Sequence, residues 1–383
     1  MEALENICIE EVEITDDNKI LINDGEYEIA LHPNMPKRII EKYLQLTFDD
    51  GATKSKLVLS ITDRCNLACD FCCHPYMDSE FSEVDAIRIV NEACKFGEFS
   101  EICLTGGEPF LRYKLIIKLA KICRDHNTLF GVITNGFWGD DEPGKKCKEL
   151  LESGVGRVSF SWDPSHGKFV SSDTMMRCID SAMDAGLKVN LTGSFKKPDD
   201  THENYGFDLS KHKKYANFVQ STHNVVQAGR GTKLRDLYRE SLDQDSINQF
   251  RCPAIVKGND MTLYSMNGLS MPCCSVFSGY NLFQLSIGDW RESSIEELYL
   301  NHITDGYYRI INDFGFNYFF EVVESVNPEL YKKLPCMSEC TSSCELCSKL
   351  AVMDEFPLIR KICNEHIDML ILNKVEHIFS QAT

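Results

Sequence analysis

Between residues 56 and about 230, short apolar runs alternate with amphipathic segments, and this alternation limits the possible folds most strongly. Amphipathic stretches separate the runs, and several end at a glycine, as helices often do. The pattern predicts an α/β domain with a parallel sheet, either open or closed into a barrel. Six runs have strand length and recur about every thirty residues, at 56–62, 101–106, 129–134, 157–162, 187–193 and 223–229.

Unusual residues follow each of the first five predicted strands. Because the carboxyl ends of parallel strands lie at one edge of a sheet, we expect these motifs to form a single site. They are CNLACDFCC at 65–73, GGEP at 106–109, NGFW at 135–138, DPSH at 163–166 and GSF at 193–195.

The net charge, the apolar runs and the cysteine content of the chain limit which functions it can have. The chain has 383 residues and a net charge of -18, so nucleic acid and anionic membranes are not expected as partners. The N-terminus does not read as a secretory signal, and no run of eighteen or more apolar residues occurs, so we expect a cytoplasmic protein. Cytosolic thiols stay reduced, and the eighteen cysteines therefore indicate metal binding or catalysis rather than disulfides.

The cysteines fall into two kinds. Cys94, Cys123, Cys147 and Cys178 are isolated in helix-like segments, and we expect them to be small buried hydrophobic residues. Cys65, Cys69 and Cys72 instead form a C-x3-C-x2-C loop, a thiolate set suited to zinc or to an iron-sulfur cluster. Three ligands leave one metal position open for a substrate or cofactor.

These motifs resemble those of the radical S-adenosylmethionine (SAM) enzymes. The resemblance is carried by CNLACDFC, by GGEP one strand later, and by the order of the strand-end motifs. It implies a partial (β/α)6 TIM-like barrel. It also implies that Cys65, Cys69 and Cys72 hold a 4Fe-4S cluster that binds SAM. The reduced cluster would cleave SAM to a 5'-deoxyadenosyl radical, which abstracts hydrogen from the substrate.

The resemblance also suggests further site residues. Gly106 and Gly107 would let the backbone approach the ligand, and Glu108 would accept hydrogen bonds from the ammonium group of SAM. Asn-Gly is also an ordinary turn, and Asp163 before proline could simply cap a helix. The predicted cofactor-binding residues are Phe71, Gly106, Gly107, Glu108, Pro109, Thr134, Asn135, Ser159, Ser161 and Arg230. The catalytic candidates are Tyr76, Asp163, His166 and Cys274.

A second cysteine pattern lies in the C-terminal half. Cys252, Gly268 and Cys273 form C-x15-G-x4-C, within two short strands joined through Asn-Gly. This resembles the start of the SPASM extension of radical SAM enzymes, which implies one or two auxiliary 4Fe-4S clusters. The spacing of the later cysteines departs from that extension, and a zinc knot at 336–347 stays an alternative. The candidate ligands are Cys252, Cys273, Cys336, Cys340, Cys344, Cys347 and Cys363.

We predict five segments. They are an N-terminal hairpin and helix extension (1–50), a radical SAM core (51–230), a linker (231–250), a SPASM-like domain (251–365) and a C-terminal helix (366–383). The hairpin is expected around the Asn-Asp-Gly turn at 23–25, and its helix near 36–45.

The predicted function is modification of a peptide or protein, such as cross-linking, thioether formation, epimerisation or side-chain oxidation. A flavodoxin or ferredoxin would supply electrons. A radical SAM enzyme acting on a small metabolite would share every core motif. A non-enzymatic zinc or redox-sensor protein would leave GGEP unexplained.

Overall fold

The computed structural model describes residues 12–14, 19–22, 27–30, 55–72, 74, 78–195, 199–224, 230, 260–273, 283–340 and 343–367. The chain divides into two compact units. One comprises 53–302 and 335–354, and the other comprises 1–52, 303–334 and 355–383. The predicted linker lies outside the described residues, and the functional boundaries proposed from sequence stay predictions.

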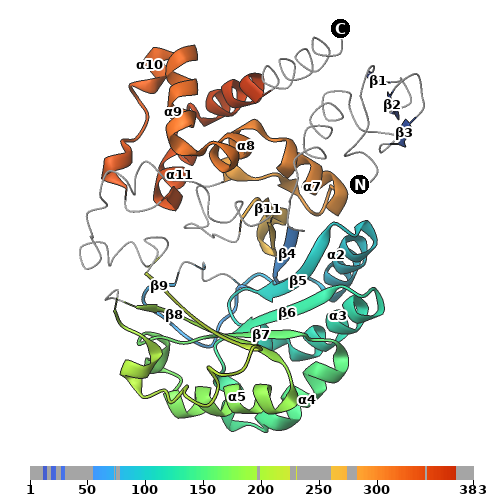
Figure 1. Cartoon of the computed structure of the whole chain (residues 1–383), viewed down its shortest axis with the longest axis vertical. Coiled ribbons are helices and arrows are strands. Elements are labelled where there is room, and N and C mark those ends of the chain that lie inside the picture. The colour runs from blue at the N-terminus through green and yellow to red at the C-terminus, as the bar shows by residue number, and fades with distance from the viewer. Residues whose placement is uncertain are drawn as a thin grey trace. The chain divides into compact units, whose positions relative to one another are not determined.

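The larger unit is built on a mostly parallel sheet with the strand order β12-β11-β10-β4-β5-β6-β7-β8-β9 (Figure 1). Strands β4 to β9 pair in parallel in chain order, which confirms the predicted fold class. They span Ser55–Ser60, Phe99–Thr105, Leu129–Thr134, Arg157–Ser161, Lys188–Phe195 and Phe218–Asn224.

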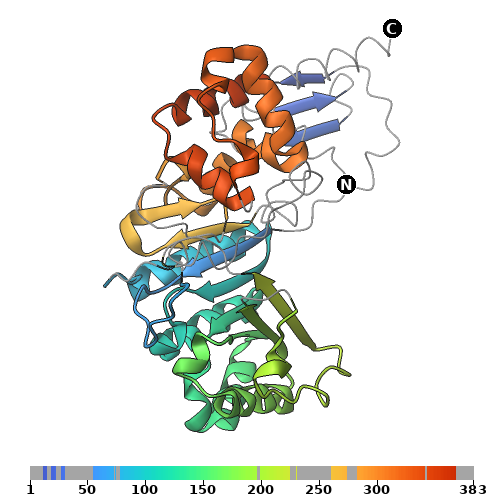
Figure 2. The same cartoon turned by 90° about the vertical axis from the view of Figure 1, so that its left-hand side faces the viewer.

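Four helices pack along these strands (Figures 1 and 2). They are α2 (Glu83–Phe96), α3 (Tyr113–Asp125), α4 (Pro143–Ser153) and α5 (Ser172–Ala185). The hydroxyl of Ser82 caps α2 by accepting a hydrogen bond from the backbone N–H of Asp85, as an N-cap residue does. The isolated cysteines are buried in this layer, as predicted: Cys94, Cys123, Cys147 and Cys178.

The prediction for the sixth strand was wrong by five residues. We expected 223–229, but β9 spans Phe218–Asn224 and pairs with β8 from Val189 opposite Phe218 onwards. The segment FVQSTHN has two apolar residues followed by five polar ones, so it lacks a clear strand pattern, and the sequence reading favoured the apolar VV pair that follows. Residues 225–229 lie outside the described part of the chain.

The predicted hairpin with the Asn-Gly turn is confirmed. Strands β10 (Met261–Tyr264) and β11 (Leu269–Met271) are antiparallel, and β12 (Gly288–Asp289) pairs with β11. Sequence reasoning did not predict that β10 pairs in parallel with β4, so that the hairpin continues the sheet of the core.

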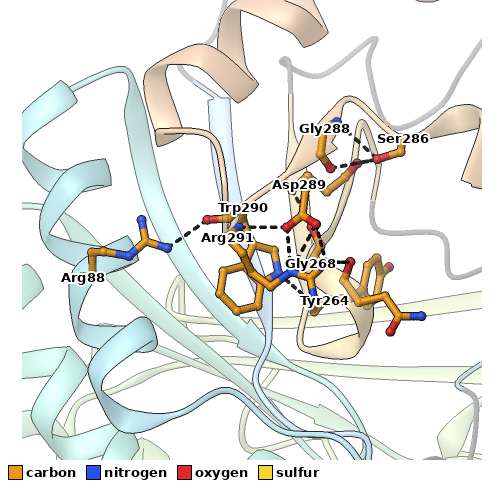
Figure 3. Close-up of polar contacts among 10 residues, drawn as sticks. Arg88, Tyr264, Gly268, Ser286, Gly288, Asp289, Trp290 and Arg291 are labelled. Atoms are coloured by element: carbon orange, nitrogen blue, oxygen red, sulfur yellow. Dashed lines mark hydrogen bonds and ion pairs between the residues drawn. The ribbon is translucent and has the colours of Figure 1, made fainter.

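Gly268 is the glycine of the C-x15-G-x4-C pattern, and the structure explains it. Its φ is +70°, and a Cβ there would lie 1.8 Å from Oδ1 of Asp289. Asp289 in turn pairs with Arg291 (Figure 3). Only glycine satisfies both the backbone angle and this close approach.

Trp290 ties the hairpin to the core (Figure 3). Its indole N–H donates to the carbonyl of Tyr264 at 2.7 Å, and its own carbonyl accepts from Arg88 of α2 at 2.8 Å. The indole also packs on Phe81, with 4.5 Å between ring centroids. The hairpin is therefore fixed to the sheet and to α2 at once.

Short 3-10 helices follow several strands of the larger unit, at Pro109–Arg112, Phe137–Asp140, His166–Lys168, His202–Tyr205, Met266–Gly268 and Phe283–Leu285. Another, Met337–Glu339, precedes α11 (Ser343–Ala351). Helix α7 spans Ile295–Thr304.

The smaller unit contains α8 (Gly306–Asp313), α9 (Gly315–Val326), α10 (Pro328–Tyr331) and a helix over 356–367. Tyr307 is at its core, in edge contact with Phe319 and Phe356. The predicted N-terminal hairpin is present as β2 (Lys19–Ile22) and β3 (Tyr27–Ala30), joined by a third strand, β1 (Val12–Ile14). The helix predicted at 36–45 lies outside the described residues.

Within the described residues, no helix combines the length and the apolar composition needed to cross a membrane.

Candidate active site

A cavity of about 180 Å³ lies where β4, β5, β6 and β7 end. Residues that follow each of these strands line it, so four of the five predicted strand-end motifs meet as expected. The GSF motif forms the last three residues of β8 and does not line the cavity. The predicted cofactor-binding residues in the lining are Phe71, Gly106, Gly107, Glu108, Pro109, Thr134, Asn135, Ser161 and Arg230, and His166 of the catalytic candidates joins them.

All three cysteines of the C-x3-C-x2-C loop line this cavity. Cys65 and Cys72 pack against a small cluster formed by Leu67, Cys69 and Val170. Burial raises the pKa of the Cys65 thiol to about 11. A bound metal centre is therefore needed to hold this sulfur as a thiolate at neutral pH.

The sequence left two metal centres open for these three thiols, a zinc ion and an iron-sulfur cluster. A single tetrahedral zinc would bring its sulfur ligands within about 4 Å of one another. In the described part of the chain, no three His, Cys, Asp or Glu side chains converge on one ion in this way. A 4Fe-4S cluster instead takes each cysteine on a different iron, and three thiols around one cavity fit it.

The GGEP motif holds the cysteine loop. A Cβ on Gly106 would lie 2.3 Å from the carbonyl oxygen of Thr62, and one on Gly107 would lie 2.1 Å from that of Arg64. The N–H groups of Gly107 and Glu108 donate to these two carbonyls at 2.7 and 2.8 Å. The glycines thus admit the loop before Cys65, and their role in letting the backbone approach a ligand stays a prediction.

Glu108 joins the ends of two strands. Its carboxylate accepts hydrogen bonds from Phe110 N–H at 2.9 Å, from the Thr134 hydroxyl at 2.9 Å and from Asn135 N–H at 2.8 Å. Burial, only partly offset by these bonds, raises its pKa to about 7. A carboxylate has about four acceptor positions, so about one is left for a ligand.

Thr134 and Asn135 at the end of β6 are also engaged by the protein. The Thr134 hydroxyl accepts from Gly136 N–H and from the Trp138 indole while donating to Glu108. These three bonds fill the capacity of a hydroxyl. The Asn135 amide donates to Oδ1 of Asn66 at 2.9 Å and reaches Sγ of Cys65 at 3.9 Å.

The DPSH turn holds the loop from the other side. Asp163 is 1% exposed, accepts from Ser165 N–H at 2.9 Å and lies 2.9 Å from Nδ1 of His166. Burial disfavours the charged ring, but hydrogen bonds to Asp163 and Cys69 raise the pKa of His166 to about 10. Asp70 of the loop contacts the Ser165 hydroxyl and pairs with Lys168 at 2.8 Å.

The other predicted site residues have varied positions. Ser159 is buried within β7 and does not line the cavity. Arg230 lines it, and its backbone N–H donates to the carbonyl of Cys72 at 3.1 Å. Tyr76, Cys252 and Cys274 lie outside the described residues.

The predicted auxiliary ligands differ in exposure. Cys336 is exposed, whereas Cys340 is buried and lies 3.5 Å from Nζ of Lys349. Cys344 and Cys347 lie three residues apart on α11 and are half-buried, as is Cys273 after β11. None of these belongs to a group of three or more converging metal ligands among the described residues, and the auxiliary clusters and the zinc knot both stay predictions.

Cys363 belongs to the smaller unit and is fully buried there. Burial raises the pKa of its thiol. Its surroundings are those of a packing residue, and its role as a cluster ligand stays a prediction.

Asp63 and His74 are two titratable residues of the cavity lining that sequence reasoning missed. Nε2 of His74 lies 2.8 Å from Oδ1 of Asp63, so the pair joins the two flanks of the cysteine loop. The strand-end rule could have identified Asp63, because it follows the first strand directly before the cysteines.

Residues 59–205 match the model of the Radical SAM superfamily. Together with the three cysteines around the cavity, this match shows that the chain contains a radical SAM domain. The cofactors of the SAM-binding site are therefore a 4Fe-4S cluster and SAM, as predicted. When bound, they supply the 5'-deoxyadenosyl radical that abstracts hydrogen.

One curated relative is similar over most of its length. The putative peptide biosynthesis protein YydG of Bacillus subtilis (strain 168) is 26% identical over 341 residues, which cover 80% of this chain and 97% of that protein. The Fe-coproporphyrin III synthase of Methanosarcina barkeri is 29% identical, over 52% of this chain and 50% of that protein. Among solved structures, native anSMEcpe with bound AdoMet and Cp18Cys peptide gives a TM-score of 0.49 at 15% identity, covering 84% and 99% of the two chains.

Proposed function

We propose that this radical SAM enzyme modifies a peptide or protein. The observation that carries the proposal is the similarity to the putative peptide biosynthesis protein YydG, which extends over 97% of that protein and beyond the radical SAM domain. Hydrogen abstraction from an unactivated carbon suits cross-linking, thioether formation, epimerisation or side-chain oxidation, the reactions expected in maturation of ribosomally made peptides.

In this proposal the chain's own residues position the reaction. Cys65, Cys69 and Cys72 would hold the SAM-binding cluster, while Glu108 and Asp163 brace the strand ends around it. The C-terminal cysteines would hold one or two auxiliary clusters beside the substrate. A flavodoxin or ferredoxin in the cytoplasm is the proposed electron donor.

The test combines the reconstituted enzyme, SAM, a reductant and short peptides encoded beside its gene. We expect 5'-deoxyadenosine together with a change in the mass or the stereochemistry of one peptide. The Cys65, Cys69, Cys72→Ala triple variant should give neither. Release of 5'-deoxyadenosine with every candidate peptide recovered unchanged would contradict the proposal.

A small-metabolite substrate is the second candidate, because the Fe-coproporphyrin III synthase of Methanosarcina barkeri matches about half of this chain. That match covers only 50% of the relative, so the similarity does not extend to the substrate of that protein. Hydrogen abstraction from a porphyrin precursor, with no peptide modified, would favour it.

A further inference from the structure

Two cysteines outside the candidate active site are in contact with each other. Cys94 lies in the last turn of α2 and Cys123 in the last turn of α3, and the two helices pack side by side (Figure 1). The two sulfurs are 4.0 Å apart, close enough for one thiol to donate a hydrogen bond to the other. The fold thus brings together two thiols that are 29 positions apart in the sequence.

This pair lies at the edge of the sheet opposite the cavity. Helix α2 ends just before β5 begins at Phe99, and α3 ends just before β6 begins at Leu129. The cavity instead lies where these strands end, and neither cysteine of the pair lines it. The pair is therefore separate from the cysteine loop and from the site of SAM.

The two thiols of the pair differ in exposure and in acidity. Cys94 is 9% exposed, whereas Cys123 is fully buried. The hydrogen bond between them lowers the pKa of Cys94, against the effect of burial, and the same bond together with burial raises the pKa of Cys123. Because the thiolate is the form that reacts with oxidants, Cys94 is the residue of the pair that would react first.

A second pair of helix cysteines provides a contrast. Cys147 on α4 and Cys178 on α5 are both fully buried, and burial raises the pKa of each thiol. Sγ of Cys178 donates a hydrogen bond to the carbonyl of Gly136 at 3.3 Å. These two thiols are therefore held in the neutral form and are expected to act as packing residues only.

We propose that Cys94 and Cys123 form a reversible disulfide when the protein meets hydrogen peroxide. The Cys94 thiolate attacks one peroxide oxygen, the O–O bond breaks, and a sulfenic acid and one water are formed. The Cys123 thiol then attacks the Cys94 sulfur, the S–S bond forms, and the sulfenic oxygen leaves as a second water. Two thiols thus lose two electrons and two protons, and one peroxide is reduced to two waters.

The geometry of the pair allows this step. The sulfurs must approach each other by about 2 Å to reach bonding distance. Both cysteines lie in the last turn of a helix, where the ends fray and side chains can shift. Disulfides in reducing compartments are usually transient and redox-sensing, and this one is proposed to be of that kind. The proposal goes beyond the proposed function and does not depend on the class of the substrate.

The experiment treats the anaerobically reconstituted enzyme with a series of hydrogen peroxide concentrations. The remaining thiols are alkylated under denaturing conditions, and the digest is mapped by mass spectrometry without reductant. We expect a peptide that links Cys94 to Cys123 and that a dithiol reductant splits. A link between Cys147 and Cys178 is the internal control, and we expect at least about tenfold less of it, because the thiolate fraction falls tenfold for each unit by which the pKa is raised.

Three variants separate the steps. Cys123→Ser removes the second thiol, so Cys94 should stop at the sulfenic acid, which a cyclic β-diketone traps. Cys94→Ser should give neither the link nor a sulfenic acid at Cys123. Cys147→Ser is the matched control, because it changes a buried helix cysteine outside the pair, and it should form the Cys94–Cys123 link to the native extent.

The native sequence alone can overturn the proposal. Free thiols at both Cys94 and Cys123, in samples whose loop cysteines are already oxidised, would do so. Equal amounts of the two links would do so as well, as would a trapped sulfenic acid at Cys94 without any link to Cys123. Iron content is measured in each sample, so that damage to the clusters is recorded separately, and failure to modify any peptide would leave these results intact.

Discussion

The two groups of cysteines differ in how the fold holds them. The loop carrying Cys65, Cys69 and Cys72 is bonded to residues that follow β5, β6 and β7, and its sulfurs line one cavity. The group at 336–347 lies on a 3-10 turn and a nine-residue helix, with Cys336 exposed. The first site is therefore organised by the sheet before any metal binds, whereas order in the second depends more on its own ligand.

The largest effect is expected where the sheet and the loop touch. In Gly107→Ala the added Cβ would lie 2.1 Å from a backbone oxygen that cannot move alone. We expect about four irons per chain to be lost, with a destabilisation of about 1 to 3 kcal/mol, by overpacking. Gly144→Ala is the control, because nothing lies within 4 Å of a Cβ there. Iron analysis of both proteins checks this, and full iron loading of Gly107→Ala would contradict the comparison.

The second effect is a pH dependence of stability at Glu108. Its pKa is about 7 in the folded protein against an ordinary 4.5, so the folded state holds the proton longer. The protonated carboxyl of Glu108 therefore contributes to the free energy of unfolding, and this contribution is complete below pH 4.5. It is lost as the pH rises through 7, and the free energy of unfolding falls by up to about 1.4 kcal/mol per pH unit. In Glu108→Gln the thermal unfolding midpoint should depend less on pH over this range. An equal slope in native and variant proteins would remove Glu108 as the cause.

A kinetic comparison sharpens the difference between the two cysteine groups. Under a chelator, we expect iron held at 336–347 to leave several-fold faster than iron held at 65–72, because Cys336 is exposed whereas the three loop cysteines are buried or half-buried. Spectroscopy of the two cluster signals during chelation measures this. Loss of iron from both sites at the same rate would show that the contacts of the first loop with the sheet do not slow the release of its iron.

The smallest effect is expected at the rim of the loop. Asp70 pairs with Lys168, and both side chains are about half exposed. Such pairs contribute roughly 0 to 1 kcal/mol, so Asp70→Asn should shift the thermal midpoint only slightly and leave the iron content unchanged. A large loss of iron in this variant would show that the exposed pair of Asp70 and Lys168 is needed to hold the cysteine loop in its cluster-binding conformation.

Much of the core could be predicted from sequence because local patterns determine it. Apolar runs located five of the six parallel strands, and the carboxyl-end rule correctly placed GGEP, Asn135 and His166 around the cysteines. The sixth strand was misplaced because five of its seven residues are polar, whereas an apolar pair follows it.

Other features depend on tertiary contacts that no local pattern shows. The pairing of β10 with β4 joins residues about 200 positions apart. The glycines of GGEP face backbone carbonyls of the cysteine loop, and the hydroxyl of Thr134 is fully used inside the protein. Asp63 is different, because its place just after the first strand could have identified it, although no periodicity marks a single acidic residue in a polar loop.

The most direct test of the central claim is the iron, sulfide and zinc content per chain after anaerobic reconstitution. The native sequence is compared with the Cys65, Cys69, Cys72→Ala triple variant. We predict about eight or twelve irons in the native protein, for one or two auxiliary clusters, with about four lost in the variant together with all cleavage of SAM. Zinc in the N-terminal site, or an unchanged iron content in the variant, would contradict the assignment of this loop to a SAM-binding cluster.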